Sequence, residues 1–191
     1  PKLALITGGV RRLGAVIAGE LAREGYALAL TSSKADAQPD TALADTALAD
    51  ILREQGTEYH VFTANLSDHA SAPQLIDDVT THFGRAPDLL VNNASMFGQD
   101  QWSDMDAASL EAHFGLNFFA PMLLSTALLK AAGENARPAI VHILDQRIRN
   151  PNADQVSYTL TKQALAASVR SLASAFGTRA RVNGVAPGLV I

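Results

Sequence analysis

The 191-residue sequence contains no cysteine, which excludes a disulfide framework and a thiolate zinc site. The sequence also has no large excess of either positive or negative side chains. The net charge of -4, from 15 basic and 19 acidic side chains, provides no electrostatic footprint for nucleic acid or an anionic membrane. The five histidines lack ligand spacing, so no metal site is expected. Neither a membrane-spanning apolar run nor a signal peptide is apparent, and the sequence predicts a cytoplasmic protein.

Short apolar runs alternate with amphipathic segments along the whole chain. Strands are predicted at residues 3–6, 27–31, 59–64, 89–92, 139–144 and 181–185. Helices are predicted from residue 12 to about 25, at 40–55, 71–83 and 107–132, and around residue 158. The repeat TALADTALAD at 41–50 is interpreted as solvent-facing helix. This order predicts one α/β domain, residues 1–191, with a Rossmann-type doubly wound parallel sheet and helices on both faces.

A glycine-rich turn, TGGVRRLG at residues 7–14, follows the first predicted strand. In a doubly wound sheet the ligand binds at the carboxyl ends of the strands, so this turn would lie at the site. Glycine permits a tight turn, and the N-terminus of the next helix offers free N–H groups and a positive dipole end to a phosphate. The alternative is a purely structural turn in which Gly14 packs against the sheet.

The second predicted strand ends in Thr31-Ser32-Ser33-Lys34, without an acidic residue. An acid there would accept a hydrogen bond from the adenosine ribose of NAD, whereas Ser33 and Lys34 suit a 2'-phosphate. Together with Arg11 and Arg12, these residues predict NADP(H) as the cofactor. The alternative is that Lys34 is an ordinary surface lysine.

Tyr158 and Lys162 lie four residues apart in the segment QVSYTLTKQ, residues 155–163. On a helix, both side chains leave the same face. An ammonium group close to a phenol favours the phenolate and is expected to lower the pKa of Tyr158 towards neutrality. The pair therefore predicts an acid/base unit, against the alternative of a surface tyrosine beside a solvated lysine.

Five motifs in this order resemble those of the short-chain dehydrogenase/reductase family, from Lys2 to Gly188. The glycine motif matches Thr7, Gly8 and Gly14, with Arg12 where the family has glycine. The motif after the fourth strand matches Asn92, Asn93 and Ala94, with Ser95 in place of glycine. The family's catalytic asparagine matches Asn117, its Tyr-x-x-x-Lys pair matches Tyr158 and Lys162, and its Pro-Gly matches Pro187 and Gly188.

The resemblance implies a role for each of these positions. Lys162 would also bind the nicotinamide ribose, Asn117 would hold a water that returns the proton to Tyr158, and Asn65, followed by Leu66, would contact adenine. The implied cofactor-binding residues are Thr7, Gly8, Arg11, Arg12, Leu13, Gly14, Ser33, Lys34, Asn65, Leu66, Asn93, Ala94, Tyr158, Lys162, Pro187 and Gly188.

Two departures from the family pattern narrow the prediction. Asp145 stands thirteen residues before Tyr158, where the family usually has a serine that holds a substrate carbonyl. A carboxylate would repel an oxyanion, which favours a substrate with nitrogens to bind or protonate. The second departure is the glycine turn, which contains Arg12. Together with Asp145 and the sequence from Asn93 to Phe97, this turn makes the chain resemble the pteridine reductase branch of the family.

By that resemblance Phe97 would stack on a flat heterocycle, and Ser95, Asp145 and Tyr158 would complete the substrate site. The alternatives are that Asp145 caps a turn, that Phe97 belongs to the core, and that the two arginines bind only phosphate. Two alternative functions remain for the protein: a ketone or 3-oxoacyl reductase, and a catalytically silent NADP-binding regulator.

The resemblance also implies a homotetramer built partly on two long helices. The family continues past the position of Ile191 through a substrate-covering loop and a last strand, which this sequence does not contain.

Overall fold

The computed structural model describes residues 1–33, 43 and 46–188, and these residues form a six-stranded parallel sheet. The strands lie in the order β3-β2-β1-β4-β5-β6. Their bounds are β1 Leu3–Ile6, β2 Ala27–Ser32, β3 Tyr59–Thr63, β4 Leu89–Asn92, β5 Ala139–Ile143 and β6 Arg181–Val185. Each strand lies within one residue of its prediction, and the doubly wound parallel fold is confirmed.

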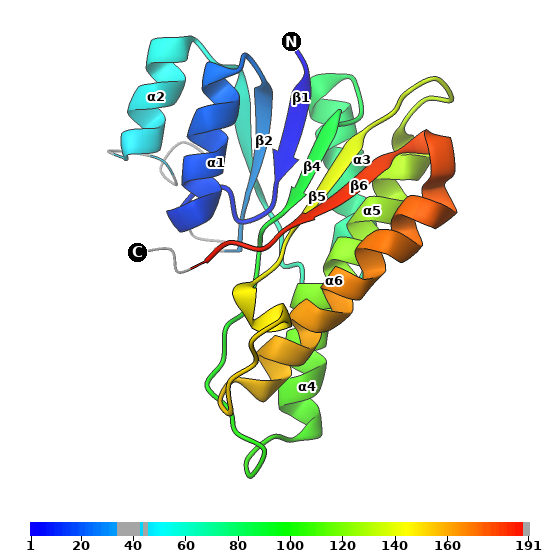
Figure 1. The fold of residues 1–191 in the computed structure, drawn as a ribbon. Helices are drawn as coiled ribbons and strands as arrows, with labels where there is room; N and C mark the ends of the chain where they lie inside the picture. The colour runs from blue at the N-terminus through cyan, green and yellow to red at the C-terminus, as the bar shows by residue number, and fades with distance from the viewer. Residues whose placement is uncertain (34–42, 44–45, 189–191) are drawn as a thin grey trace.

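Helices cover both faces of the sheet (Figure 1). On one face, α1 (Arg12–Arg23) packs with α2 (Ala47–Gln55). The other face carries α3 (Ser71–Phe83), α5 (Ala120–Ala131) and α6 (Val156–Phe176). Successive side chains of a strand point to opposite faces of the sheet, so each strand contributes to both cores. In β1, Leu3 and Leu5 pack in the core under α3 and α5, whereas Ala4 and Ile6 pack in the core under α1. Both cores are therefore supplied by the same short apolar runs.

One continuous helical stretch, Ala107–Ala131, consists of α4 (Ala107–Phe114), a single π-helical turn η1 (Gly115–Phe119) and α5. Contrary to the sequence interpretation, this stretch is long and apolar enough to cross a membrane by length and composition. Its residues Ala120, Leu124 and Leu128 are buried against the sheet. That burial is typical of the core helix of a soluble protein.

The predicted helix at 40–55 begins only at Ala47. Thr46 is extended, and its hydroxyl accepts from Ala49 N at 3.2 Å and donates to Leu43 O at 2.8 Å. This hydroxyl cap fixes the helix start. Residues 34–42 and 44–45 lie outside the described part of the chain, as does the candidate cofactor residue Lys34. The interpretation of the repeat as solvent-facing was wrong, because Leu43 and Leu48 are buried in the core beneath α1 and α2.

The carboxyl ends of the strands face α4, the short helix η2 (Gln146–Ile148) and the first turns of α6, which extend beyond the sheet (Figure 1). A second short helix, η3 (Gly177–Arg179), joins α6 to β6. Strand order reverses between β1 and β4, and doubly wound sheets open a ligand crevice at that point. Several predicted site residues follow the strands that border this crevice.

Candidate active site

The turn between β1 and α1 needs glycine at two positions. Gly8 has a φ of 63°, in the left-handed region that favours glycine, and its N–H donates to Thr31 Oγ1 at 2.9 Å. A Cβ at Gly14 would collide with the Gly8 carbonyl oxygen and lie 2.8 Å from Asn93 Nδ2. The turn thus packs directly on the segment that follows β4.

Arg12, the first residue of α1, also has a positive φ, of 50°. This explains why the family places glycine there, since a side chain in this conformation costs on the order of 1–3 kcal/mol. The chain tolerates this strain and gains a guanidinium at the mouth of the turn.

A cavity of about 400 Å³ lies at the crevice between β1 and β4. Ten predicted cofactor residues line it, together with the predicted substrate residue Ser95: Gly8, Arg11, Arg12, Leu13, Gly14, Ser33, Asn65, Leu66, Asn93 and Ala94. It is also lined by residues that the sequence analysis did not assign: Val10, Thr31, Ser32, Ala64, Ser67 and Leu116. All of these except Thr31 adjoin an assigned residue in the sequence, and Leu116 lies beside Asn117 in the π-helical turn.

Thr7, Pro187 and Gly188 are not among the lining residues. Thr7 is buried below the cavity, where its hydroxyl accepts from the N–H groups of Asn93 and Ala94, both at 2.9 Å. It therefore shapes the segment after β4 rather than offering a free contact to a ligand. Cofactor contacts by Pro187 and Gly188 stay predictions.

Asn117 lies in the π-helical turn and is buried. Its side-chain nitrogen donates to Met96 O at 2.9 Å and to Thr161 Oγ1 at 3.1 Å. Its oxygen accepts from Met96 N at 2.7 Å and from Ser95 Oγ at 3.2 Å. The amide thus ties the segment after β4 to α6, and a water held by Asn117 stays a prediction.

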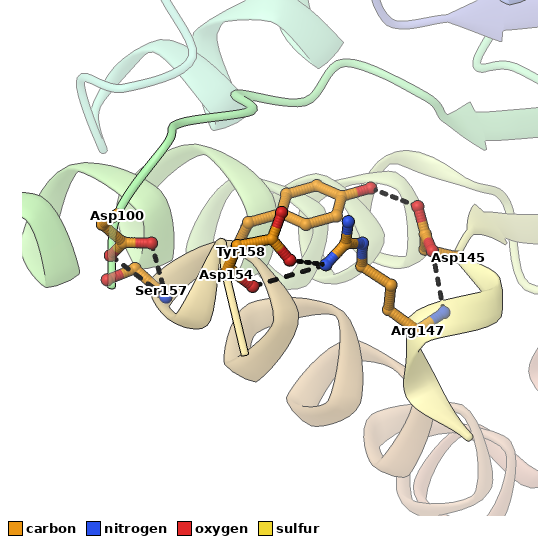
Figure 2. Close-up of polar contacts among 6 residues, drawn as sticks. All are labelled: Asp100, Asp145, Arg147, Asp154, Ser157 and Tyr158. Atoms are coloured by element: carbon orange, nitrogen blue, oxygen red, sulfur yellow. Dashed lines mark hydrogen bonds and ion pairs between the residues drawn. The ribbon is translucent and has the colours of Figure 1, made fainter. Parts of the chain in front are cut away.

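The structure brings Asp145 and Tyr158 into direct contact (Figure 2). The hydroxyl of Tyr158 donates to Asp145 Oδ2 at 2.8 Å, while Asp145 Oδ1 accepts from Arg147 N at 2.8 Å and caps η2. The alternative that Asp145 caps a turn is therefore correct, and it is compatible with a place in the site because each oxygen has its own partner.

Lys162 lies one helical turn after Tyr158, buried, and its ammonium donates to Ile143 O at 2.8 Å. The ammonium nitrogen is 5.7 Å from the centroid of the Tyr158 ring. Burial lowers the pKa of Lys162 to about 8, although the negative charge of Asp145 acts in the opposite direction.

The expected lowering of the Tyr158 pKa was wrong for this structure. Burial raises the pKa of Tyr158, and the hydrogen bond to Asp145 and its negative charge raise it further. The sequence argument considered the lysine alone, whereas the fold places a carboxylate on the hydroxyl itself. Tyr158 is thereby held as a protonated phenol.

Phe97 does not belong to the core. Its side chain is 56% exposed, and its ring meets the Tyr158 ring edge to face, with centroids 4.7 Å apart. An exposed aromatic face beside a phenol and a carboxylate suits a flat, polar ring.

The N-terminus of α6 is held by a residue that the sequence analysis missed. Gln155, which precedes α6, has a φ of 57°, and no side chain of its own segment caps the helix. Asp100 instead accepts from Ser157 N at 3.3 and 3.2 Å, and its carbonyl accepts from Gln155 N at 2.6 Å. Figure 2 shows this contact next to Tyr158. The loop carrying Phe97 therefore fixes the turn that carries Tyr158.

A sheet of this strand order with a glycine turn at its switch point defines the dinucleotide-binding class of α/β folds. The family model for short chain dehydrogenase matches residues 2–191, and the chain belongs to that family. It is an oxidoreductase family, which confirms the resemblance seen in the motifs.

Among curated relatives, pteridine reductase 1 of Leishmania tarentolae is 33% identical, over 99% of this chain and 76% of its own length. An NADPH-dependent aldehyde reductase 1 of Arabidopsis thaliana chloroplasts is 31% identical, over 98% of this chain and 65% of its own length. Among solved structures, the FolM alternative dihydrofolate reductase 1 of Brucella canis, complexed with NADP, has a TM-score of 0.86 and 33% identity. That match covers 98% of this chain and 73% of the other.

Proposed function

We propose that this protein is an NADPH-dependent reductase that transfers hydride to a C=N or C=O carbon of a dihydropterin-like heterocycle. The observation that carries the proposal is the 2.8 Å hydrogen bond from Tyr158 to Asp145 with the Phe97 ring beside it. The similarity to a pteridine reductase and to a FolM reductase supports it.

The residues around the cavity suit the cofactor. Arg11 and Arg12, from the turn after β1, line it together with Ser33, which follows β2 at a position where an acid would disfavour a 2'-phosphate. NADPH supplies the hydride. Tyr158 supplies the matching proton, Lys162 holds the nicotinamide ribose, and Asn117 keeps Ser95 and the substrate loop against α6.

Asp145 decides the substrate class in this proposal. Its carboxylate would repel the oxyanion that forms when a simple ketone is reduced. A ring N–H or amino group can instead donate to Asp145, while Tyr158 turns its proton towards the reacting atom. The runner-up is a carbonyl reductase, which the similarity to an aldehyde reductase favours.

The cofactor assignment predicts that NADPH raises the melting temperature more than NADH does. Ligand at a hundred times its dissociation constant stabilises by about 2.7 kcal/mol. For a domain of this size that is a shift on the order of 5–10 °C. The measurement is thermal unfolding with matched concentrations of both cofactors. Ser33→Asp, which places a carboxylate at the end of β2, is expected to reverse the preference, and equal shifts for wild type would refute the assignment.

The substrate assignment is tested by oxidation of NADPH with 7,8-dihydrobiopterin, dihydrofolate, menadione and simple ketones. Wild type is expected to prefer the dihydropterin. Asp145→Ser is expected to lose dihydropterin turnover by about tenfold or more, the effect of one lost charged hydrogen bond, and to gain activity on ketones. Asp145→Asn serves as the matched control, since it keeps the shape and removes the charge. A folded Asp145→Ser with an unchanged substrate ranking would exclude the role of Asp145.

We further propose a single domain over residues 1–191, a homotetrameric assembly and a cytoplasmic location, without a nucleic-acid or membrane partner. The composition and the family membership support these points. Size-exclusion chromatography with light scattering tests the assembly.

A further inference from the structure

Arg147 lies at the centre of the polar contacts around Tyr158, and neither the motifs nor the proposed chemistry uses it. Its backbone N–H donates to Asp145 Oδ1 at 2.8 Å. Its guanidinium Nη1 donates to Asp154 Oδ1 at 3.0 Å and to Asp154 O at 3.3 Å. Figure 2 shows Arg147 spanning the space between these two acids.

This arginine is not a surface residue with a solvated ion pair. Its side chain is only 15% exposed, although its partner Asp154 is 46% exposed. The hydrogen bond from Arg147 lowers the pKa of Asp154. A largely buried cation is costly unless it is paired and hydrogen-bonded, and Asp154 supplies that partner.

Asp154, the ion-pair partner of Arg147, is itself held in place by a backbone contact. Asp154 forms an antiparallel β-bridge with Gln101, which lies in the loop that carries Phe97. The neighbouring residue of that loop, Asp100, holds the first turn of α6. The guanidinium is therefore held against a segment that also positions Tyr158.

The charged groups near Tyr158 have opposite effects on the ionisation of its hydroxyl. Asp145, after β5, accepts its hydrogen bond and opposes ionisation, whereas the positive charge of Arg147 favours ionisation. Lys162, one turn along α6, lies across the ring but directs its ammonium to the Ile143 carbonyl. Arg147 is thus a cation that can offset the carboxylate when Tyr158 gives up its proton.

We propose that Arg147 is a positioning residue: its backbone N–H orients Asp145 towards Tyr158, and its guanidinium, anchored by Asp154, stabilises the phenolate left after proton transfer. The assignment rests on the proposed role of Tyr158 as the acid. It adds to that role an electrostatic group from η2 that stands outside the Tyr-x-x-x-Lys motif.

The test compares Arg147→Met with Arg149→Met. Arg149 lies two residues further along and is exposed, so the control removes the same charge from the same turn. With NADPH and 7,8-dihydrobiopterin, Arg147→Met is expected to lower kcat about tenfold, the effect of roughly one pKa unit on the acid. The KM for NADPH is expected to stay within about twofold. Arg147→Lys, which keeps the charge, is expected to recover most of the loss.

A second readout does not depend on turnover. In protein labelled with [13Cζ]tyrosine, the resonance of Tyr158, assigned by its loss in Tyr158→Phe, is expected to move in Arg147→Met and to stay in place in Arg149→Met. Circular dichroism checks the folding of each variant. An unmoved resonance in folded Arg147→Met, or a kcat equal to that of the control, would overturn the proposal.

These readouts separate the two assignments. If wild type does not reduce the dihydropterin, the substrate proposal fails and the resonance decides the role of Arg147. If wild type is active and Arg147→Lys is no better than Arg147→Met, the electrostatic role is refuted.

Discussion

Replacing Tyr158 with phenylalanine is expected to reduce turnover about a thousandfold, within the usual range for loss of a general acid. Tyr158 is buried, and the change removes one hydroxyl and little shape. The cavity between β1 and β4 does not include Tyr158 among its lining residues, so the thermal shift produced by NADPH is expected to stay close to that of wild type. Steady-state oxidation of NADPH and thermal unfolding measure the two effects.

Tyr59→Phe is the matched control for this change. Tyr59 begins β3 and is 38% exposed, far from the contacts around Asp145 in the sheet order. It is expected to retain full activity. A Tyr158→Phe enzyme with more than about a tenth of wild-type kcat would assign the proton to another group.

Lys162→Met is expected to abolish most turnover and at the same time to stabilise the fold at pH 7. Burial lowers the pKa of Lys162 to about 8, from the usual 10.5 of a lysine. Between these values the unfolded chain binds more protons than the folded one, so stability rises with pH across that window. Below about pH 8 the folded protein carries the full cost of a buried ammonium.

That cost is on the order of 3 kcal/mol, and the lost hydrogen bond to the Ile143 carbonyl offsets about 1 kcal/mol of it. Lys162→Met is therefore expected to melt a few degrees higher at pH 7. Its stability is also expected to lose the rise that wild type shows between pH 8 and 10.5. Denaturant unfolding at several pH values measures both.

Lys130 provides a control for this experiment, and His142 does not interfere with it. Lys130 is exposed at the end of α5, and Lys130→Met serves as the control that removes an exposed lysine. His142 lies near Lys162, but burial and the charge of Lys162 lower the pKa of His142 to about 4, well below the pH range of this experiment. A Lys162→Met protein that is less stable than wild type at pH 7 would contradict the burial argument.

The fold could be predicted because its strands are short apolar runs and its turns contain glycine. The faces of the helices were less predictable. In α1 the apolar residues Leu13, Val16, Ile17 and Leu21 recur at helical spacing, yet Val16 is 62% exposed. The small residues Ala18 and Ala22 pack against the sheet instead. Periodicity identifies a helix, but the closeness of its approach to the sheet decides which face is buried.

The site was predictable where a residue follows a strand. Gly8 was found in this way because the carboxyl ends of parallel strands meet at one edge. Asn93 and Asp145 also follow strands, but they were found through the resemblance to the family. Asp100 and Arg147 were not found, since each acts through a contact between segments distant in the sequence or through its own backbone. Their residue types carry no signal without the fold.

The pKa of Tyr158 shows the same limit. A tyrosine and a lysine on one helix face predict a lowered pKa by proximity alone. In the structure the Lys162 ammonium is directed at a carbonyl and the Tyr158 hydroxyl at Asp145, so the sign is reversed. Hydrogen-bond direction, which spacing does not encode, decides the outcome.

In the proposed function, the cap on α6 would couple substrate binding to proton transfer. Asp100 is 57 residues from Ser157 in the sequence, so the first turn of α6 is secured only while the loop with Phe97 is docked. Local opening of that loop would expose the Ser157 amide and release the turn that carries Tyr158 as one cooperative unit. In the proposed function, a substrate ring bound against Phe97 would hold this unit closed, and Tyr158 would then be most rigid when a substrate is present.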